Sequence, residues 1–553
     1  MSKTILLLLF LSIFSVKTYS QDHPQIGKFE ETVNENGIIK KRTVINAERN
    51  EGYQYPQEYN QIPFILDANG TNLRWNTGDA TAISNHCEVS RNGNRTINSW
   101  DLNNKRISLY GNANSTPAWE YFVSTQTSQN NIAISDTGGV IATGSYHSIL
   151  LFNSSSNTPF FNYDLTTLPD TGIAGPVDIT SNGNFLIACA SRSDSSTIFG
   201  FNSGSTTPVW SFKVVPTVST GLIQGIRISA NDSVVIVNTY GEFLVFRTYT
   251  GQLLDRGLIN PLSTSGTQSR QGISGDGSII ATINYRGYVR VFQWNGSSYV
   301  FQWEHQEAPG SFYNWMYAVD ITDNGDFIAV GTLNFITASS YDGKVKVFSS
   351  GSSTPIWTFS GAGDEISNVS FSKSGNILSA SSYGPISNST EDLFIFKTFA
   401  GNAPLYALNT PGSLYWTSTS GDGRTVIAGG KAIHARTFGN GGTLYNIEVD
   451  TNDIPVGIVN NSGNTPESYA LYQNYPNPFN PSTQIRFDIA KASGVKLTIY
   501  NQLGQQVTLL VNGELQAGSY SYNFDASAYS SGVYFYKLET EGFSQTRKML
   551  LIK

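Results

Sequence analysis

The hydrophobic pattern of this chain repeats at a nearly fixed interval. An alternating apolar strand ends in Ser or Thr, a short polar turn follows, and a second strand carries a near-continuous apolar run. Successive turns lie 45, 45, 49, 45, 48, 50 and 48 residues apart. The turns begin at Ser90, Ser135, Thr180, Ser229, Ser274, Thr322, Ser372 and Ser420, in sequences such as SRNG, TSNG and SGDG. A period of this length is typical of a repeat architecture.

The pattern within each repeat unit predicts four antiparallel strands. Alternating pairs such as Ile132 and Ile134 mark a half-buried first strand, and runs such as VIAT and FLIA mark a second strand buried on both faces. Asn-Gly and Asp-Gly turns tolerate the positive φ that joins such strands tightly. A third strand ends in an aromatic residue (ILLF, FLVF, VKVF), and a fourth often opens with Pro (TPAW, TPVW, TPIW), which suits an edge strand.

A single sheet of this kind has two apolar faces, and radial packing into a closed ring buries both. We therefore predict an all-β fold in which residues 71–450 form an eight-bladed β-propeller. Seven blades are the alternative, because the first unit is degenerate after its turn. The segment TNLRWN at 71–76 looks like a surplus fourth strand that can close the ring against the last unit.

The rhythm of strand, SxDG turn, VxVF strand and PxW strand resembles the WD40-like and quinoprotein-like propeller superfamilies. The WD dipeptides and the Gly-His signature of standard WD40 repeats are missing from this sequence. The tryptophan-docking repeat AxDxxTGxxxW of quinoprotein dehydrogenases is also missing. The resemblance therefore implies the fold, and we expect no cofactor.

The two cysteines fall at strand positions. Cys87 aligns with the buried face of its first strand, and Cys189 lies in the second strand of the third unit. Units one and three are not neighbours in a ring, and a disulfide needs Cα atoms within about 7 Å of each other. We predict two free, buried thiols.

A different rhythm begins near the C-terminus. Residues 451–468 read as a polar, Gly- and Pro-punctuated linker. Residues 469–553 then hold six or seven short alternating strands separated by turns, a pattern that suggests a small antiparallel sandwich.

This C-terminal module carries four motifs: YPNPFNPSTQIRF, LTIYNQLGQQV, SGVYFYKL and KMLLIK. In this order they closely resemble the type A C-terminal sorting domain of the type IX secretion system. The resemblance implies an immunoglobulin-like sandwich, recognised by the outer-membrane translocon and then removed by a sortase-like protease. By the same resemblance, recognition falls on Tyr475, Pro476, Asn477, Pro478, Phe479, Gly532, Tyr534, Lys548 and Lys553.

The first twenty residues have the pattern of a secretory signal peptide. Lys3 precedes an apolar run from Ile5 to Val16, and Thr18-Tyr19-Ser20 offers small residues for cleavage after Ser20. The run is shorter than the roughly 20 residues needed to cross a bilayer, so we expect no transmembrane span in the mature protein. Residues 21–70 form an N-terminal polar segment. The signal-peptide pattern and the sorting motifs together predict a secreted or cell-surface protein.

Composition narrows the class of ligand. The 553 residues include 14% charged side chains and 12% aromatic ones, with a net charge of −7 and no basic run. The negative net charge and the absence of a basic run in the sequence argue against a nucleic-acid-binding protein, which needs a basic patch. The five histidines form no HxH or HExxH motif, and hairpin chemistry accounts for the turn acids, so we expect no metal site. No GxSxG elbow or P-loop occurs, and no catalytic residue is assigned.

Insertions offer the best candidates for a binding surface. Residues 332–344 and 382–392 lengthen the second-to-third-strand connections of units six and seven. Function on a propeller is usually found in such loops. The segment before the sixth unit adds a candidate aromatic binding loop of Phe312, Tyr313, Trp315 and Tyr317.

The sequence favours a binding scaffold for a protein or glycan and leaves open whether the protein is an enzyme. An extracellular polysaccharide hydrolase or lyase is the alternative. Three or more titratable side chains converging in the channel would favour the enzyme. A channel mouth lined by Ser, Thr, Asn and aromatic residues would favour binding.

Overall fold

The computed structural model describes residues 28–35, 38–45 and 71–552. Within the last range it leaves out 124–130, 169–171, 192–194, 216–220, 260–267, 308–313, 338, 452–457, 461–465, 481, 492, 516 and 527–528. In the N-terminal unit, Met1–Tyr53, the strands β1 (Lys28–Glu35) and β2 (Ile38–Ile45) form an antiparallel hairpin. This hairpin lies inside the segment expected to be merely polar.

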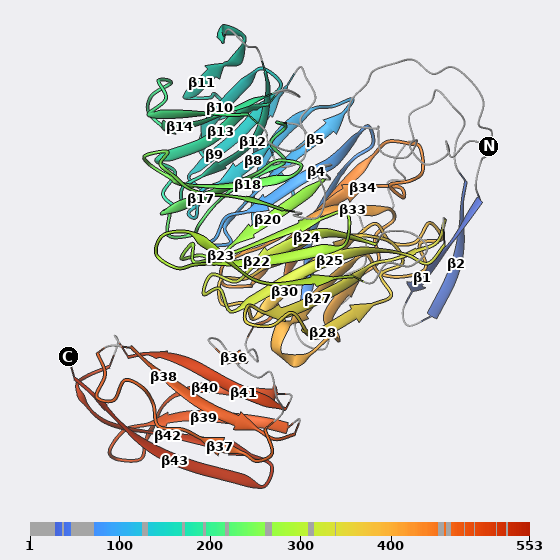
Figure 1. Ribbon diagram of the computed structural model, residues 1–553. Helices are drawn as coiled ribbons and strands as arrows, with labels where there is room; N and C mark the ends of the chain where they lie inside the picture. Colours follow the sequence, from blue (N-terminus) through green and yellow to red (C-terminus); the bar gives the residue numbers. More distant parts are fainter. Residues whose placement is uncertain are drawn as a thin grey trace, which may run out of the picture. The chain divides into compact units, whose positions relative to one another are not determined.

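Eight antiparallel sheets follow one another between Thr71 and Val449 in the described chain; each has four main strands, and the sixth has a short fifth strand in addition (Figure 1). The first four are β4 (Ala82–Val89), β5 (Arg95–Leu102), β6 (Arg106–Gly111), β7 (Pro117–Phe122); β8 (Ile132–Ile134), β9 (Val140–Ser145), β10 (Ser148–Asn153), β11 (Phe161–Asp164); β12 (Ile173–Ile179), β13 (Phe185–Ser191), β14 (Ser196–Asn202), β15 (Trp210–Val214); and β16 (Gly225–Ile228), β17 (Val234–Asn238), β18 (Glu242–Arg247), β19 (Leu253–Leu258).

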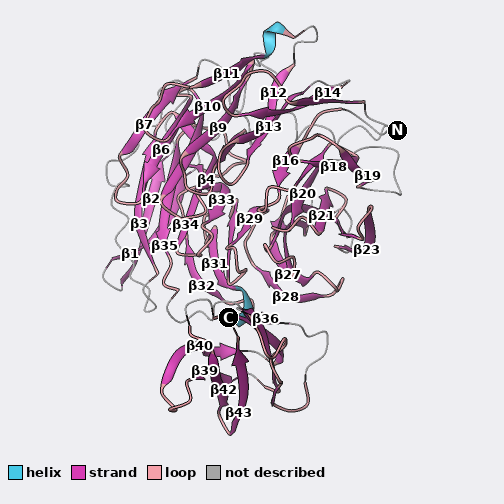
Figure 2. Ribbon diagram, turned by 90° about the vertical axis from the view of Figure 1, so that its left-hand side faces the viewer, coloured by secondary structure: helices cyan, strands magenta, loops and turns pink. Residues whose placement is uncertain are grey.

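The fifth to eighth sheets complete the series. They are β20 (Ser269–Ile273), β21 (Ile279–Asn284), β22 (Tyr288–Trp294), β23 (Tyr299–Gln306); β24 (Trp315–Ile321), β25 (Phe327–Phe335), β27 (Lys344–Ser349), β28 (Pro355–Ser360); β29 (Ile366–Phe371), β30 (Ile377–Ser382), β31 (Leu393–Lys397), β32 (Pro404–Leu408); and β33 (Ser413–Thr419), β34 (Thr425–Lys431), β35 (Gly442–Glu448), β3 (Asn72–Asp79). The short β26 (Tyr341–Asp342) adds to β25. The helical pieces of the described chain include two 3₁₀ turns, η2 (Leu165–Thr167) and η3 (Thr398–Ala400) (Figure 2).

The sheets close into a ring. The first strand of each sheet contacts the first strand of the next, and β33 of the eighth sheet contacts β4 of the first. The strand β3, which comes before the first sheet in sequence, pairs with β35 and becomes the outer strand of the eighth. The all-β propeller predicted from the repeats is confirmed.

The recurring Ser or Thr before each turn has a structural cause. Gly93 donates its N–H to the Ser90 carbonyl and adopts φ +74°, and most of the other turns repeat this geometry. In the fourth turn Asp232 takes the positive φ in place of glycine. The Ser or Thr hydroxyl then accepts the N–H of the residue five positions later, as Ser135 does from Val140 at 3.0 Å. One hydroxyl therefore fixes each hairpin end.

The second strand of each unit is buried on both faces, as the continuous apolar runs predict. Every described residue of β13, β17 and β21 is buried. Apolar clusters lie between neighbouring sheets, for example between the second and third sheets around Leu151, Val177 and Phe201. Cys87 and Cys189 are free and buried, as predicted.

Tryptophans on five of the eight outer strands of the described chain join their sheet to the next. Their indole N–H groups donate to a backbone carbonyl of the following sheet: Trp75 to Asn112 (3.1 Å), Trp119 to Ser154 (3.1 Å), Trp210 to Thr248 (2.9 Å), Trp303 to Ser350 (2.6 Å) and Trp357 to Thr398 (2.8 Å). A half-buried indole N–H needs such a partner, and a large ring also covers the sheet edge. These tryptophans therefore serve packing between neighbouring sheets.

The C-terminal module has two four-stranded sheets. One is β36 (Ile458–Asn460), β41 (Gly518–Asp525), β38 (Ser482–Ile489) and β37 (Ala470–Leu471); the other is β40 (Gln506–Leu515), β39 (Ser493–Tyr500), β42 (Gly532–Thr540) and β43 (Phe543–Leu551). Both contribute to one core, with Phe487, Leu497 and Leu538 fully buried. The strand β36 lies within residues 451–468, so part of the expected linker is a strand of this module.

Candidate functional site

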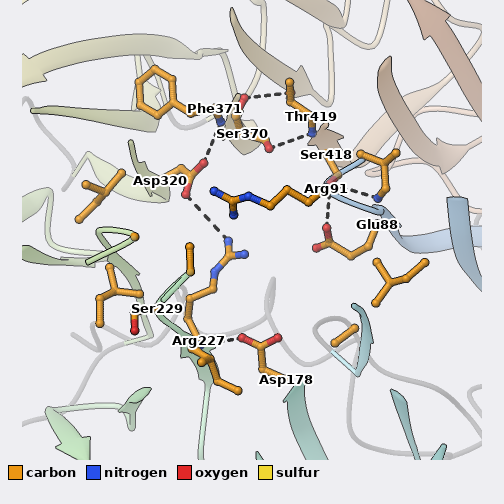
Figure 3. A pocket seen from close by; sticks show the side chains of 18 of the residues that line it. Glu88, Arg91, Asp178, Arg227, Ser229, Asp320, Ser370, Phe371, Ser418 and Thr419 are labelled. Carbon is orange, nitrogen blue, oxygen red and sulfur yellow. Dashed lines mark hydrogen bonds and ion pairs between the residues drawn. The ribbon is translucent and has the colours of Figure 1, made fainter. Parts of the chain in front are cut away.

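One residue of each first strand points into the centre of the propeller. This residue lies two positions before the turn Ser or Thr. Its two neighbours in the strand are mostly buried between sheets. Because side chains alternate along a strand, its own side chain points to the opposite side, into the channel. We call these eight positions the channel ring: Glu88, Ala133, Asp178, Arg227, Gly272, Asp320, Ser370 and Ser418. All except Gly272 line a cavity of about 270 Å³ (Figure 3).

Four members of the channel ring hold the next sheet in place. Asp178 accepts the N–H of Ile228 at 2.7 Å, and Asp320 accepts that of Phe371 at 2.8 Å. Ser370 accepts the Thr419 N–H at 3.0 Å, and Ser418 accepts the Val89 N–H at 3.3 Å. In each case an inner-strand side chain accepts a backbone N–H of the following sheet. These polar positions therefore contribute to ring closure as well as to the cavity.

Glu88 receives three side-chain donors. Its Oε1 lies 3.0 Å from His86 Nε2 and accepts from Trp416 Nε1 at 3.2 Å, and its Oε2 accepts from Ser418 Oγ at 2.7 Å. Burial raises the pKa of this carboxyl, but the hydrogen bond from His86 and nearby positive charge outweigh burial and lower it. Burial lowers the pKa of His86, whose ring lies against Trp416 with centroids 4.2 Å apart. Glu88 is therefore a hydrogen-bonded carboxylate.

Arg227 supplies the positive charge within the channel ring. Its Nη2 lies 4.0 Å from Asp320 Oδ1, and it points toward that residue (Figure 3). Burial opposes its charge, but Asp320, Glu88 and Asp178 together raise its pKa. Burial dominates at Asp178, raising its pKa to about 6, and also raises that of Asp320. The channel ring thus holds three acids, Glu88, Asp178 and Asp320, around the Arg227 cation.

The turn side of the cavity is crossed by Arg91. This residue of the first sheet forms ion pairs with Asp323 of the sixth sheet and, at 3.8 Å, with Asp136 of the second. Backbone hydrogen bonds also link successive turns, including Gly421 N–H to Arg91 O at 2.8 Å. The mouth therefore carries charged side chains, unlike the Ser-, Thr-, Asn- and aromatic-lined mouth set out as the mark of binding.

The candidate aromatic loop is only partly described. Phe312 and Tyr313 lie outside the described residues. Trp315 is half-buried with its ring stacked on Tyr285 at 4.8 Å, and Tyr317 is 8% exposed with its ring stacked on Tyr285 at 5.2 Å. Trp315 and Tyr317 therefore belong to a larger aromatic cluster, whose other members the sequence analysis did not identify.

We call this group the tyrosine cluster. It consists of Tyr285, Trp315, Tyr317, Tyr383 and Tyr415, which come from the fifth to eighth sheets, and Glu365, which precedes β29. Glu365 is 2% exposed, and its Oε1 accepts no hydrogen bond from the described residues. Burial, followed by the charge of Asp364, raises the pKa of Glu365 to about 7. Trp315 and Tyr317 were candidates from the sequence, but the other four members stand singly in the fifth, seventh and eighth units, so no sequence pattern indicated that they join the cluster.

Glu365→Gln should flatten the pH dependence of stability. Because the folded-state pKa is raised from 4.5 to about 7, the folded chain binds more protons than the unfolded chain within this window. Stability therefore falls as the pH rises from about 4.5 to 7, by up to about 3 kcal/mol. The variant should lack this loss, measured by denaturant unfolding between pH 4.5 and 8.

Glu88→Gln is the matched control. The folded-state pKa of Glu88 is lowered, so its own titration falls below this window, and its removal should change the slope between pH 5 and 8 much less than Glu365→Gln does. The groups that face Glu365 are Asp364, Arg436, Arg270, Tyr383, Tyr317, Tyr415 and Tyr285. An unchanged slope in Glu365→Gln would assign the pH dependence to other acids whose pKa is raised by burial, such as Asp178 at about 6.

The sorting-motif residues are brought together with the last strand. Asn477 Oδ1 accepts the Leu550 N–H at 2.9 Å, and its Nδ2 donates to the Lys548 carbonyl at 3.4 Å. The backbone of Phe479 exchanges hydrogen bonds of 3.0 Å with Leu550 and Ile552. The proline-rich segment around Asn477 and Phe479 is therefore hydrogen-bonded along β43, although the two segments lie about seventy residues apart in the sequence.

Exposure divides these residues into two groups. Tyr475, Pro476, Asn477, Pro478 and Lys548 are exposed, and Tyr475 keeps 82% of its surface. Phe479 is a core residue instead, with its ring 6.3 Å from Phe524. Gly532 pairs with Leu551, and the Tyr534 hydroxyl donates to the Ser530 carbonyl at 2.9 Å. Ser20 and Lys553 lie outside the described residues. We call the exposed group the sorting surface.

Residues 473–553 match the family described as "Secretion system C-terminal sorting domain". The C-terminal module is a type IX secretion sorting domain. The protein is accordingly exported to the cell surface or secreted. Phe487, Leu497 and Leu538 thus form the core of the sorting domain, and the sorting surface lies at its proline-rich entry.

The propeller was also compared with solved structures. One match is the β-propeller domain of Myceliophteria thermophila Cps50 (Swd1), at 11% identity and a TM-score of 0.41, covering 56% of this chain and 96% of that one. No curated protein matches the chain. Within the described ranges, no helix is long and apolar enough to cross a membrane, and no three His, Cys, Asp or Glu residues gather to hold a metal ion.

Proposed function

We propose that the exported propeller acts at the cell surface, or after release, as a binding scaffold for a glycan or a protein. The supporting observation is that the channel acids are already engaged. Glu88 accepts from three side chains, and Asp178 and Asp320 each accept a backbone N–H from the next sheet. A general acid or base must exchange a proton with its substrate, and carboxylates fixed in this way are poorly placed for that role.

A polysaccharide hydrolase or lyase is the second candidate. Glu88, Asp178 and Asp320 line one cavity together with Arg227, which meets the convergence criterion for an enzyme. The raised pKa of Asp178, about 6, is also of the kind that suits a general acid near neutral pH. The hydrogen bonds that occupy these groups favour binding over catalysis.

The sorting surface is the face that we expect the secretion machinery to read. The hydrogen bonds of Asn477 to β43 hold the proline-rich segment beside the last strand, so a translocon can contact both segments at once. A sortase-like protease is the expected processing partner. Removal of the domain would leave the propeller, closed by β3, as the delivered part.

One experiment separates binding from catalysis. The exported chain is purified and incubated with a panel of polysaccharides, and both retention in affinity gels and release of reducing ends are measured. We expect retention, or capture of a protein partner, with no release above that of a Glu88→Gln, Asp178→Asn variant. Release by the wild type that this variant lacks would establish the enzyme and reject the scaffold.

A further inference from the structure

The tyrosine cluster lies beside the end of the channel cavity opposite the turns. Arg270 and Trp416 line that cavity, and the Arg270 guanidinium lies 4.5 Å from the Tyr317 ring centroid and 5.7 Å from that of Trp416. Arg270 Nη1 also donates to the Ser367 carbonyl at 3.0 Å. The cluster therefore adjoins the channel, with Arg270 between them.

Glu365 lies among the tyrosines. Burial raises the pKa values of Tyr285, Tyr317, Tyr383 and Tyr415, and the nearby Glu365 carboxylate raises them further. The backbone N–H of Tyr383 donates to the Glu365 carbonyl at 3.1 Å, and Oε1 of the Glu365 side chain stays without a donor from the described chain. A buried acceptor without a partner costs about 1–3 kcal/mol. A ligand hydroxyl would satisfy it.

The neighbouring loops are held firmly. Arg436 binds both carboxylate oxygens of Asp364 at 2.7 Å and lies 4.2 Å from the Tyr341 ring centroid. His434 Nε2 lies 2.8 Å from the Gly384 carbonyl. These contacts tie together the second-to-third-strand connections of the sixth, seventh and eighth sheets. Fixed loops reduce the entropy lost when a ligand binds.

The chemistry of the cluster selects among ligands. Aromatic faces attract the polarised C–H groups of a sugar ring, and they also attract cations. Arg270 already holds the cation position over Tyr317, so a second positive group would be repelled. A peptide would instead need a longer row of acceptors and apolar pockets. An uncharged polyhydroxyl ligand fits the stacked rings, the open carboxyl oxygen and the guanidinium together.

We infer that the tyrosine cluster is a binding site for an uncharged glycan, with the half-buried Tyr285 and Trp315 as its aromatic contacts and Glu365 as the hydroxyl acceptor. This inference rests on the proposed binding function and assigns its ligand class and location. The loops of the sixth to eighth sheets form the wall of the site.

The test is affinity gel electrophoresis of the purified exported chain in gels containing dextran, laminarin, lichenan, xyloglucan or galactomannan. At least one should retard the wild type. Tyr285→Ala and Trp315→Ala should each weaken that retardation about tenfold or more, as loss of a central aromatic contact does. Glu365→Gln keeps the shape of the side chain and should weaken it by a smaller factor. Near-ultraviolet circular dichroism checks that each variant is folded.

Tyr146→Ala is the matched control. Tyr146 is an exposed tyrosine in the second-to-third-strand connection of the second sheet, outside the cluster, and its loss should leave retardation unchanged. Retardation that survives in Tyr285→Ala and Trp315→Ala would overturn the inference while leaving a binding function standing. Failure of all five polysaccharides to retard the wild type would also overturn it, whereas cleavage of a polysaccharide would reject the scaffold itself.

Discussion

A chain truncated after Asp450 should fold as a propeller and remain in the periplasm. The propeller is complete at this point, since Val449 donates its N–H to Arg424 and Asp450 donates to Thr71 Oγ1. The strand β36 pairs with β41 and belongs to the sorting domain, so the cut must precede residue 458. Without the sorting surface the translocon has nothing to read, and surface and medium fractions should lose nearly all of the protein. Immunoblots of the fractions measure this.

Point variants refine the truncation. Asn477→Ala removes the hydrogen bonds that fasten the proline-rich entry to β43 and should reduce delivery without unfolding the domain. Leu503→Ala is the control, because Leu503 is also exposed but lies in the turn between β39 and β40. Normal delivery of the truncated chain would refute the sorting assignment. Equal loss in both point variants would place recognition elsewhere on the domain.

The fold was predictable because it depends on local patterns that recur. Each Ser or Thr before a turn, each apolar alternation and each outer-strand aromatic residue has its effect within one unit or its neighbour. The two buried thiols followed from the same periodicity. The strand β36 was missed because three residues in a polar, Gly-rich stretch have no periodicity to detect. The same holds for the hairpin of β1 and β2 within the polar N-terminal segment.

The candidate sites were less predictable, for a physical reason. The channel ring takes one residue from each of eight units, and Ala133, Arg227 and Ser418 hold equivalent positions with unrelated chemistry. Identifying it requires alignment of the turns and knowledge of which face points inward. The tyrosine cluster is harder still, because Glu365 follows a glycine-rich turn and Tyr285 stands alone after β21. Only ring closure brings them together.

The ring charges illustrate how packing and chemistry compete for the same side chains. Asp178 and Asp320 each accept a backbone N–H from the neighbouring sheet, and their burial disfavours the charged carboxylate and so raises their pKa values. Arg227 offsets part of that cost by lying among them. Glu365 is more deeply buried than these aspartates and has no donor on Oε1 from the described residues, which distinguishes a group available to a ligand from one used by the fold.

Deletion of residues 71–80 should have the largest effect on stability, because β3 closes the ring. The strand pairs with β35 from Asn72 to Asp79 and buries Leu73 and Trp75. Trp75 donates to Asn112 of the first sheet at 3.1 Å, and Asp79 pairs with Arg106 of that sheet at 2.8 Å. Loss of the strand exposes β35 as an unpaired edge prone to association. We expect a chain that aggregates or unfolds without a single cooperative transition.

Single substitutions give the quantitative form of this prediction. Leu73→Ala and Trp75→Ala should each lower the free energy of unfolding by about 2–5 kcal/mol, as large-to-small core changes do. Asn76→Ala, on a half-buried position of the same strand, should change it by about 0.5 kcal/mol or less. Denaturant unfolding followed by tryptophan fluorescence measures all three. A deleted chain that unfolds cooperatively at the wild-type midpoint would show that closure does not depend on β3. Restoration of folding by a peptide of residues 71–81 would show that it does.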